Sequence, residues 1–442
     1  MNAQTPADGG PAARARTVLA PLLAGFLDET ESVYLDLHRH PELSGQEERT
    51  AGVVADFLEK GGFDVVTGIG GHGVAGVLRN GDGPTVMLRA DMDALPLRES
   101  TGLPYASERR AVFDGEEVPV AHACGHDAHT SSMLAAAVLL ARARGEWRGT
   151  LLAVAQPAEE TGDGAQAMLD DGLYRHVAHP DVALAQHVVP LPVGIVGHRS
   201  GPMMAASAVV KVRLFGRGGH SSAPQAAVDP VVLAAHVITR LQTIVARETD
   251  PADCAVVSVG TVHAGTKANI IPETADLGIS VRCYDDALQG RLLDAIRRVV
   301  EAEAAASGAP RPPEIEVTEG VPVNENTPEA TATVRAAHDA YFGGGRVIEM
   351  PLLAASEDFP YFGAAGAGAH YDGPAVPTVY WVVGSASAEA WQAAPGTTPQ
   401  EKVKGLPTNH SPQFAVDPRP TLLTASEAMV TAALSYLNDP AS

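Results

Sequence analysis

The most restrictive feature of this 442-residue chain is the alternation of short apolar runs with helical patterns. The run Thr85–Arg89 is apolar at successive positions, which is typical of a strand covered by helices on both faces of a sheet. Further helix and strand patterns alternate at Ser131–Ala143, Thr150–Ala155, Ala165–Asp170 and Val182–Gln186. This order predicts an α/β sandwich with a mostly parallel central sheet.

An N-terminal segment carries two motifs that need separate interpretation. Ser44 and Glu47 have the spacing of a capping box, which predicts a helix that begins there and ends at Gly61. Strand patterns follow at Phe63–Thr67 and Val74–Leu78, and the glycines between them fit GxGxxG. That motif binds a dinucleotide only where a helix follows it. Because a strand follows here, we predict a glycine-rich hairpin.

Beyond Gly201 the pattern changes to that of a second domain. Residues 203–318 read in the order β-α-β-β-α-β, which is typical of a ferredoxin-like α+β fold. Thr327-Pro328 then starts another helix, and α/β patterning resumes to the end of the chain. We therefore predict that the first domain has two parts, 1–202 and 319–442, with the ferredoxin-like domain inserted between them.

Charge limits the partners of the chain. Its 31 Lys and Arg residues face 53 Asp and Glu residues, which gives a formal net charge of −22. Such an acidic surface repels nucleic acid and anionic lipid, so we expect neither as a partner.

The apolar runs and cysteines indicate a compartment. No run reaches the roughly 18 apolar residues that span a bilayer. Thr17–Leu27 resembles a signal peptide but lacks a small-residue cleavage site, so we expect a helix there. The cysteines Cys124, Cys254 and Cys283 are odd in number and widely spaced, which favours a reducing compartment, the cytoplasm.

One segment has the composition of a metal site. His122–His129 contains three histidines, a cysteine and an aspartate within eight residues. Thiolate and imidazole are ligands for zinc and its neighbours. The paired cysteines of structural zinc sites are missing, so a metal here would occupy an open, catalytic site. The alternative is a buried cysteine beside surface histidines.

Other candidate ligands follow predicted strands. Glu159 and Glu160 come just after the strand Thr150–Ala155, and His187 ends another strand. Ligands in open α/β sheets bind outside the carboxyl ends of strands. One carboxylate could bind metal while its neighbour moves protons. A solvated acidic turn is the alternative for this pair, and a surface histidine is the alternative for His410, which lies in a loop.

Together these motifs resemble a known family. HACGHDAHT, QPAEETGDGA, AQHVVPLPVG, GRGGHSSAPQAAVDP and NIIPETADLGISVR, with RADMDALP, SEDFPYF and NHSPQF, are similar to the binuclear-metal amidohydrolases and peptidases. These include aminoacylases, hippurate hydrolases, indole-acetyl-amino-acid hydrolases and carboxypeptidase G. The resemblance implies that the larger domain is catalytic and that the inserted domain is a lid or dimerisation domain.

The resemblance also implies a set of site residues. Five positions correspond to the metal ligands: Cys124 (bridging), His126, Glu160, His187 and His410. Glu159 corresponds to the general base, and Asp93 to the aspartate that orients the metal site. Asp91 stands where other branches have a ligating histidine, and Asp127 and His129 have no assigned role.

Substrate contacts are implied in the inserted domain. His220 corresponds to a residue that contacts the substrate or the oxyanion, in some cases from a partner subunit, and Asn269 and Arg282 to binders of the substrate carboxylate. An arginine could hold a carboxylate through two hydrogen bonds. The alternatives are a solvent-facing Arg282 and a His220 that caps the glycine-rich turn.

We therefore expect a metal-dependent hydrolase of N-acyl-amino acids. Two divalent ions, Mn or Zn with Co or Ni as alternatives, would activate a water molecule, and Glu159 would move its proton. The resemblance implies a homodimer formed through the inserted domain. One alternative is a dipeptidase or carboxypeptidase with the same site, and another is a non-catalytic metal-binding protein with this fold.

Overall fold

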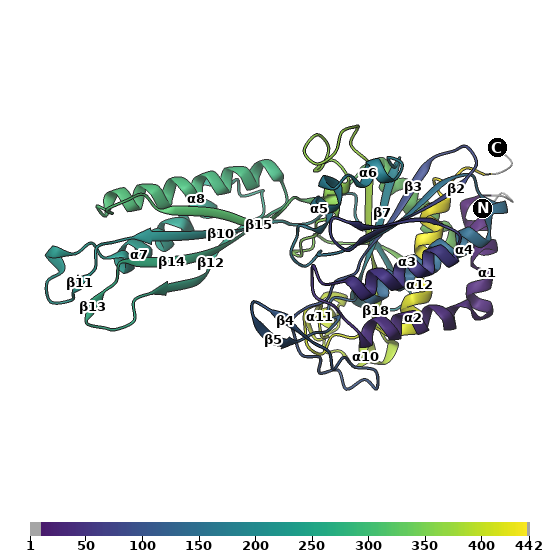
Figure 1. Ribbon diagram of the computed structural model, residues 1–442, viewed down its shortest axis with the longest axis horizontal. Coiled ribbons are helices and arrows are strands. Elements are labelled where there is room, and N and C mark those ends of the chain that lie inside the picture. Colours follow the sequence, from purple (N-terminus) through teal and green to yellow (C-terminus); the bar gives the residue numbers. More distant parts are fainter. Residues whose placement is uncertain (1–9, 440–442) are drawn as a thin grey trace. The chain divides into compact units, whose positions relative to one another are not determined.

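The computed structural model describes residues 10–439 and separates into two compact units (Figure 1). The large unit contains the described chain up to Gly201, the segment Glu325–Pro351 and the chain from Asp358 onward. The small unit contains Pro202–Asn324 and the short segment Leu352–Glu357. Each unit has its own hydrophobic core.

The large unit is built on an eight-stranded sheet in the order β1-β2-β6-β3-β7-β18-β8-β17. Its strands are β1 (Asp64–Ile69), β2 (Gly73–Asn80), β3 (Thr85–Asp91), β6 (Gly149–Gln156), β7 (Val182–Pro192), β8 (Val196–His198), β17 (Val347–Glu349) and β18 (Thr378–Ala386). The four central strands β6, β3, β7 and β18 are parallel, which confirms the prediction for the centre of the sheet.

Helices cover this sheet on both faces. They are α1 (Pro11–Pro21), α2 (Leu27–Arg39), α3 (Glu48–Lys60), α4 (His126–Arg142), α5 (Gly164–Asp170), α6 (Leu173–His176), α9 (Pro328–Phe342), α10 (Ala388–Ala393), α11 (Pro399–Lys404) and α12 (Pro418–Leu434). Helix α4 packs between the sheet and α2 and α12, and all its residues from His126 to Leu140 are buried. No helix within residues 10–439 is long and apolar enough to cross a bilayer.

The two N-terminal motifs have different outcomes. Strands β1 and β2 pair antiparallel, so the prediction of a glycine-rich hairpin is confirmed. The capping box is wrong, because neither Ser44 nor Glu47 bonds the first turn of α3. Glu42 does so instead, accepting the N–H groups of Arg49 (3.0 Å) and Thr50 (2.7 Å). Ser44 and Glu47 point to other parts of the large unit.

The small unit has the predicted β-α-β-β-α-β order. Its main elements are β10 (Ala206–Phe215), α7 (Pro230–Thr243), β12 (Ala255–Ala264), β14 (Thr274–Cys283), α8 (Asp286–Ala306) and β15 (Glu314–Val321). All neighbouring strands of its sheet are antiparallel, in the order β12-β14-β10-β15. A short ladder of β11 (Gly219–His220) and β13 (Ile270–Ile271) lies apart from this sheet. This is the ferredoxin-like topology.

A buried ionic network lies at the carboxyl end of the central strands. Arg89 of β3 donates to Gln156 (2.8 Å), Asp91 (2.7 Å) and Asp358 (3.1 Å). Asp358 also accepts the N–H of Ala165 in α5 (2.9 Å). The side chains of Arg89 and both aspartates are 0% exposed. One guanidinium therefore pairs with two fully buried carboxylates.

We expect Arg89→Leu to destabilise the large unit by about 3–5 kcal/mol, the usual cost of leaving a buried charge without its partner. Urea unfolding followed by tryptophan fluorescence measures this, because all 3 tryptophans belong to the large unit. The matched control is Arg79→Leu on β2, whose ion pair with Asp64 is exposed and is worth at most about 1 kcal/mol. Equal losses in the two variants would contradict the prediction.

Candidate active site

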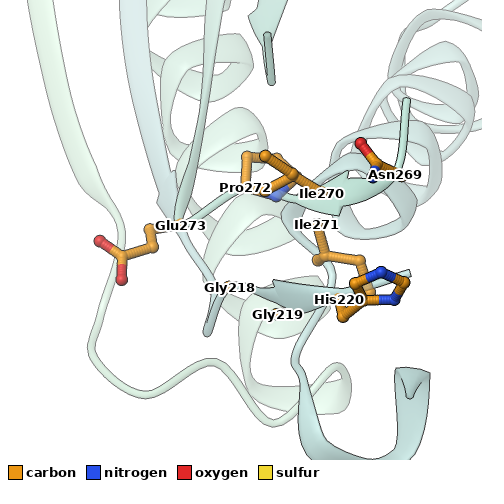
Figure 2. A pocket seen from close by; sticks show the side chains of 8 residues that line it. All are labelled: Gly218, Gly219, His220, Asn269, Ile270, Ile271, Pro272 and Glu273. Carbon is orange, nitrogen blue, oxygen red and sulfur yellow. The ribbon is translucent and has the colours of Figure 1, made fainter. Parts of the chain in front are cut away.

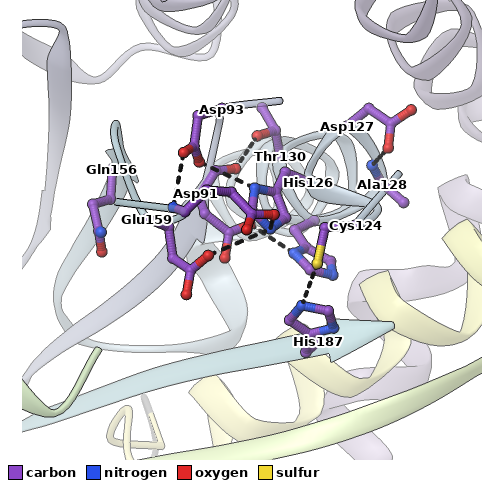
Figure 3. A network of polar contacts seen from close by, with 12 residues as sticks. Asp91, Asp93, Cys124, His126, Asp127, Ala128, Thr130, Gln156, Glu159 and His187 are labelled. Atoms are coloured by element: carbon purple, nitrogen blue, oxygen red, sulfur yellow. Dashed lines mark hydrogen bonds and ion pairs between the residues drawn. The ribbon is translucent and has the colours of Figure 1, made fainter. Parts of the chain in front are cut away.

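The candidate ligands come together in the large unit at the carboxyl edge of its sheet. Figure 3 shows three of the site residues, Cys124, His126 and His187, with Glu159 beside them. Cys124 and His126 lie at the start of α4, and Glu159 and Glu160 lie in the turn after β6. His187 lies within β7, and His410 comes from a loop before α12. Parallel strands β3, β6 and β7 bring their ends to one edge, as the sequence predicted.

Two groups of three ligand atoms share the thiol of Cys124. One group is Cys124, His126 and His187, in which the sulfur lies 3.4 Å from His187 Nε2. The other is Cys124, Glu160 and His410, in which His410 Nε2 lies 3.2 Å from Glu160 Oε2. Within each group the ligand atoms lie within 4.8 Å of one another. Cys124 therefore occupies the position that a bridging ligand needs.

Hydrogen bonds orient the two inner histidines. His126 Nδ1 lies 3.1 Å from Asp93 Oδ1, and His187 Nδ1 lies 2.8 Å from the carbonyl oxygen of Val188. Both partners are acceptors, so each Nδ1 donates a hydrogen bond and each Nε2 is the nitrogen left for a metal ion. Such support is usual for metal-bound histidines. Asp93 Oδ2 accepts Ser44 Oγ (2.7 Å) and the N–H of Glu160 (2.9 Å).

The site residues fit a cation in two further respects. His126 Nε2 and Glu160 Oε1 are buried and have no hydrogen-bond partner within residues 10–439. Hydrogen bonds to Cys124 and Glu160 raise the pKa of His410 to about 10. Burial lowers the pKa of His126. The negative charges of Asp91 and Cys124 raise it by more, so the pKa lies well above its usual value. The anionic surroundings thus favour positive charge, which divalent ions would supply.

The turn that carries the two glutamates is strained and tightly held. Ala158 has φ +53°, which is unusual for a residue with a side chain. Its carbonyl oxygen accepts the N–H of Gly164 (3.1 Å). A Cβ on Gly164 would lie 1.8 Å from the carbonyl oxygen of Pro157, so only glycine fits there. The turn leaves Glu159 Oε2 3.8 Å from His126 Nε2. Strain of this kind gathers at functional sites.

His410 lies in a second strained segment, with φ +68°. Its N–H donates to the carbonyl of Ala123 (2.8 Å). The side-chain amide of Asn409 donates to the carbonyls of Cys124 and Val188, each at 3.1 Å. The loop is thereby tied to the segments that hold the other ligands.

Asp91 and His129 have their polar atoms engaged elsewhere. Asp91 accepts His129 Nδ1 (2.6 Å) on one oxygen and Arg89 (2.7 Å) on the other. His129 Nε2 accepts the N–H of Val188 (2.8 Å), which adjoins His187. Both side chains are therefore hydrogen-bonded to neighbours of the ligand cluster, and the ligand atoms of Asp91, His126 and His129 also lie within 4.8 Å of one another.

His38 is a site residue that sequence reasoning missed. It is 3% exposed, and its Nδ1 lies 2.6 Å from Asp127. Burial lowers its pKa, but hydrogen bonds to Asp127 and Glu99 raise it to about 9 overall. A positive His38 thus holds Asp127 at the start of α4. Its position in the sequence, far from His122–His129, gave no signal of this contact.

The small unit separates the three candidate substrate contacts. His220 and Asn269 line one open pocket of about 610 Å³, with glycines and Ile270 beside them (Figure 2). Ser222 Oγ and N–H contact His220 Nδ1 at 2.7 and 3.1 Å. Arg282 lies near the other end of β14, about 27 Å along the strand from Thr274. It donates to Ala354 (2.7 Å) and Ser356 (2.8 Å).

Comparison with known proteins decides the family. A family model described as "Peptidase family M20/M25/M40" matches residues 87–405. The chain belongs to this family. It is therefore a hydrolase that acts on linear amide bonds, and the resemblance found in its motifs is confirmed.

Relatives within this M20 family agree with the assignment. The chain is 38% identical over 350 residues to the hippurate hydrolase of Campylobacter jejuni, covering 78% of this chain and 87% of that protein. It is 35% identical over 329 residues to the N-acetyl-L-cysteine deacetylase of Bacillus subtilis, covering 74% and 75%. A solved Bacillus subtilis dinuclear metal-binding M20 peptidase has 28% identity and a TM-score of 0.72, covering 93% and 98%.

We expect Cys124→Ser to weaken metal binding by at least about tenfold, since a serine hydroxyl is a poorer ligand than a thiolate. Titration of metal-free protein against a chelator measures the affinity. Cys254→Ser is the matched control, because Cys254 is exposed in the small unit and belongs to neither ligand group. An unchanged affinity in Cys124→Ser would remove the thiol from the site.

Proposed function

We propose that this M20 hydrolase cleaves the amide bond of small N-acyl-amino acids. The observation that carries the proposal is the position of Glu159, a carboxylate beside the ligand cluster that is 3.8 Å from His126 and 10% exposed. Relatives named for hippurate and N-acetyl-L-cysteine, both N-acyl-amino acids, support the substrate class.

Glu159 would serve as the proton carrier of the reaction. Two divalent ions held by Cys124, His126, Glu160, His187 and His410 would acidify a water molecule and polarise the substrate carbonyl. Glu159 takes a proton as this water attacks the carbonyl carbon, and donates a proton to the amine nitrogen as the C–N bond breaks. Asp93 keeps His126 and the backbone of Glu160 in place throughout.

We propose that the two metal ions are manganese or zinc, with cobalt or nickel as alternatives. The donor set of one thiol, three imidazoles and one carboxylate suits all four ions. Activity regained by metal-free protein with each ion in turn tests this choice.

We further propose that the protein acts as a homodimer joined through its small unit. Strand β12 is an edge of that unit's sheet, and Val256 and Val262 on it are 46% and 51% exposed. An apolar edge strand of this kind is a ready pairing surface. A dimer would also allow one small substrate to meet Arg282 of one chain and His220 or Asn269 of the other, which a single small unit keeps apart.

A peptide substrate is the second candidate. The solved M20 relative from Bacillus subtilis is named a peptidase, and a dipeptidase could use the same ligands and base. A non-catalytic metal-binding role is disfavoured, because a structural site has no use for a carboxylate at the position of Glu159.

Glu159→Gln should lower kcat by at least about 10²-fold, the usual loss on removing a general base. It should keep the full metal content, because Glu160 supplies the ligand oxygen. Activity on N-benzoylglycine and metal analysis of the same preparation measure both effects.

Glu160→Gln is the matched control, one residue away, and should lose metal as well as activity. The opposite pattern, with metal lost in Glu159→Gln and kept in Glu160→Gln, would exchange the two roles.

N-acyl-amino acids should be cleaved at least about tenfold faster than their amides, because Arg282 would bind a free carboxylate. Arg282→Ala should raise KM for the acid and remove most of this preference, since carboxylate binding is shared by ground and transition states. Arg213→Ala on β10, whose partner Asp276 is exposed, is the control. If the wild type cleaves acid and amide equally, the peptidase or a broad amidase should replace this proposal.

Sedimentation should show a dimer for the wild type and a monomer for Val256→Lys/Val262→Lys, because two lysines would place like charges along a shared β12 edge. Val317→Lys is the control, because Val317 is 42% exposed on β15, the opposite edge of the sheet. A dimer lost only in the control variant would assign the interface to β15.

A further inference from the structure

A buried carboxyl group outside the ligand cluster contacts the turn that carries Glu159 and Glu160. Glu47, just before α3, is 0% exposed. Its Oε1 accepts the backbone N–H groups of Gly45 (2.9 Å) and Ala158 (2.8 Å). Its Oε2 is buried without a hydrogen-bond partner within residues 10–439. Burying a carboxyl group in this way is costly, so the contact with Ala158 needs a functional reason.

The contact falls on the strained residue of the turn. Ala158 has φ +53°, and it directly precedes the two glutamates. Its N–H is held by Glu47, and its carbonyl is held by the N–H of Gly164 (3.1 Å) and by Thr161 Oγ1 (3.1 Å). A strained backbone persists only where its surroundings determine it. Glu47 supplies the side-chain contact on the amide side of that residue.

The segment that contains Glu47 also contacts Asp93, which holds the backbone N–H of Glu160. Ser44 Oγ donates to Asp93 Oδ2 (2.7 Å), and this oxygen also accepts the N–H of Glu160 (2.9 Å). Ser44 and Glu47, the residues of the mistaken capping box, therefore both support the backbone of the turn. Glu47 contacts Ala158 directly, and Ser44 acts through Asp93. Their spacing suits two contacts with one turn as well as it suits a helix start.

We infer that Glu47 is a positioning residue that holds the turn of Ala158 in the conformation that places Glu160 on the metal and Glu159 beside the substrate. The role given to Glu159 rests on the proposed function, whereas the placement of Glu160 rests on the geometry of the ligand cluster. The two parts can therefore be tested by different measurements.

Glutamine and leucine replacements separate this role from simple packing. Burial and the negative charge of Asp93 raise the pKa of Glu47 to about 7. Glutamine keeps the shape of the side chain, and its amide oxygen can accept the N–H of Ala158. Leucine fills similar space and accepts no hydrogen bond.

The test measures Mn²⁺ affinity of metal-free protein, kcat and KM for N-benzoylglycine, and Tm. Glu47→Leu should lose at least about tenfold in Mn²⁺ affinity and in kcat with KM changed less than about threefold, the usual scale for groups that orient a metal ligand. Glu47→Gln should stay within about threefold of wild type in Mn²⁺ affinity, kcat and KM. The control is Glu48→Leu, the same change at an exposed neighbour.

Two results would overturn the inference. One is a Glu47→Leu protein with a lower Tm but unchanged Mn²⁺ affinity and kcat, which would make Glu47 purely structural. The other is a Glu47→Gln protein as impaired as Glu47→Leu, which would assign its role to charge. If no N-acyl-amino acid is cleaved by wild type but the Mn²⁺ affinities follow the expected order, the proposed function fails and the positioning role stands.

A double variant tests the cause directly. Glycine adopts positive φ without strain, so Ala158→Gly should restore part of the Mn²⁺ affinity lost in Glu47→Leu. Glu47→Leu/Ala158→Gly with no gain over Glu47→Leu would show that the held conformation is not what Glu47 provides.

Discussion

A single buried guanidinium underlies the arrangement of the active-site edge. Arg89 pairs with Asp91 and Asp358, and all three side chains are fully buried. Asp91 in turn holds His129, which fixes the backbone next to His187, and Asp358 holds the start of α5, just after the strained turn. The positions of His187 on β7 and of the turn after β6 thus both depend on carboxylates that pair with Arg89. A different position for the candidate ligands would require different partners for these buried charges.

The fold was largely predictable because its elements have strong local patterns. The apolar run at Thr85–Arg89 requires cover on both faces, and the alternation in Ser207–Phe215 requires one buried face, so the two domains have different periodicities. Most of the candidate ligands were equally accessible, because Cys124 and His126 lie at the start of a helix and Glu159 and Glu160 follow a strand; His187 instead lies within β7, and His410 lies in a loop. Helix α4 is mostly apolar after Ser132, and its residues from His126 to Leu140 are buried.

What the sequence could not supply was the use of polar side chains over long distances. Ser44 and Glu47 fit a capping box, but Ser44 donates to Asp93 and Glu47 accepts from Ala158, both far along the chain. Glu42 caps the helix instead. The sequence assigned no role to His129, and only the geometry shows that Asp91 and Val188 contact both of its ring nitrogens. Asn269 and Arg282 are close in sequence but lie far apart along the small unit, because β14 runs extended between them.

The order of the chain has a consequence for synthesis on the ribosome. Strand β18 lies between β7 and β8, so Thr378 pairs with Ala183, which comes much earlier in the sequence. His410 is synthesised later still. The central sheet is therefore incomplete while most of the chain has already emerged, and contacts between such distant segments form slowly. The small unit, almost continuous in sequence, can complete its core first. A nascent chain would expose one unpaired apolar edge of β7 until its last quarter is made, which creates a need for protection from aggregation.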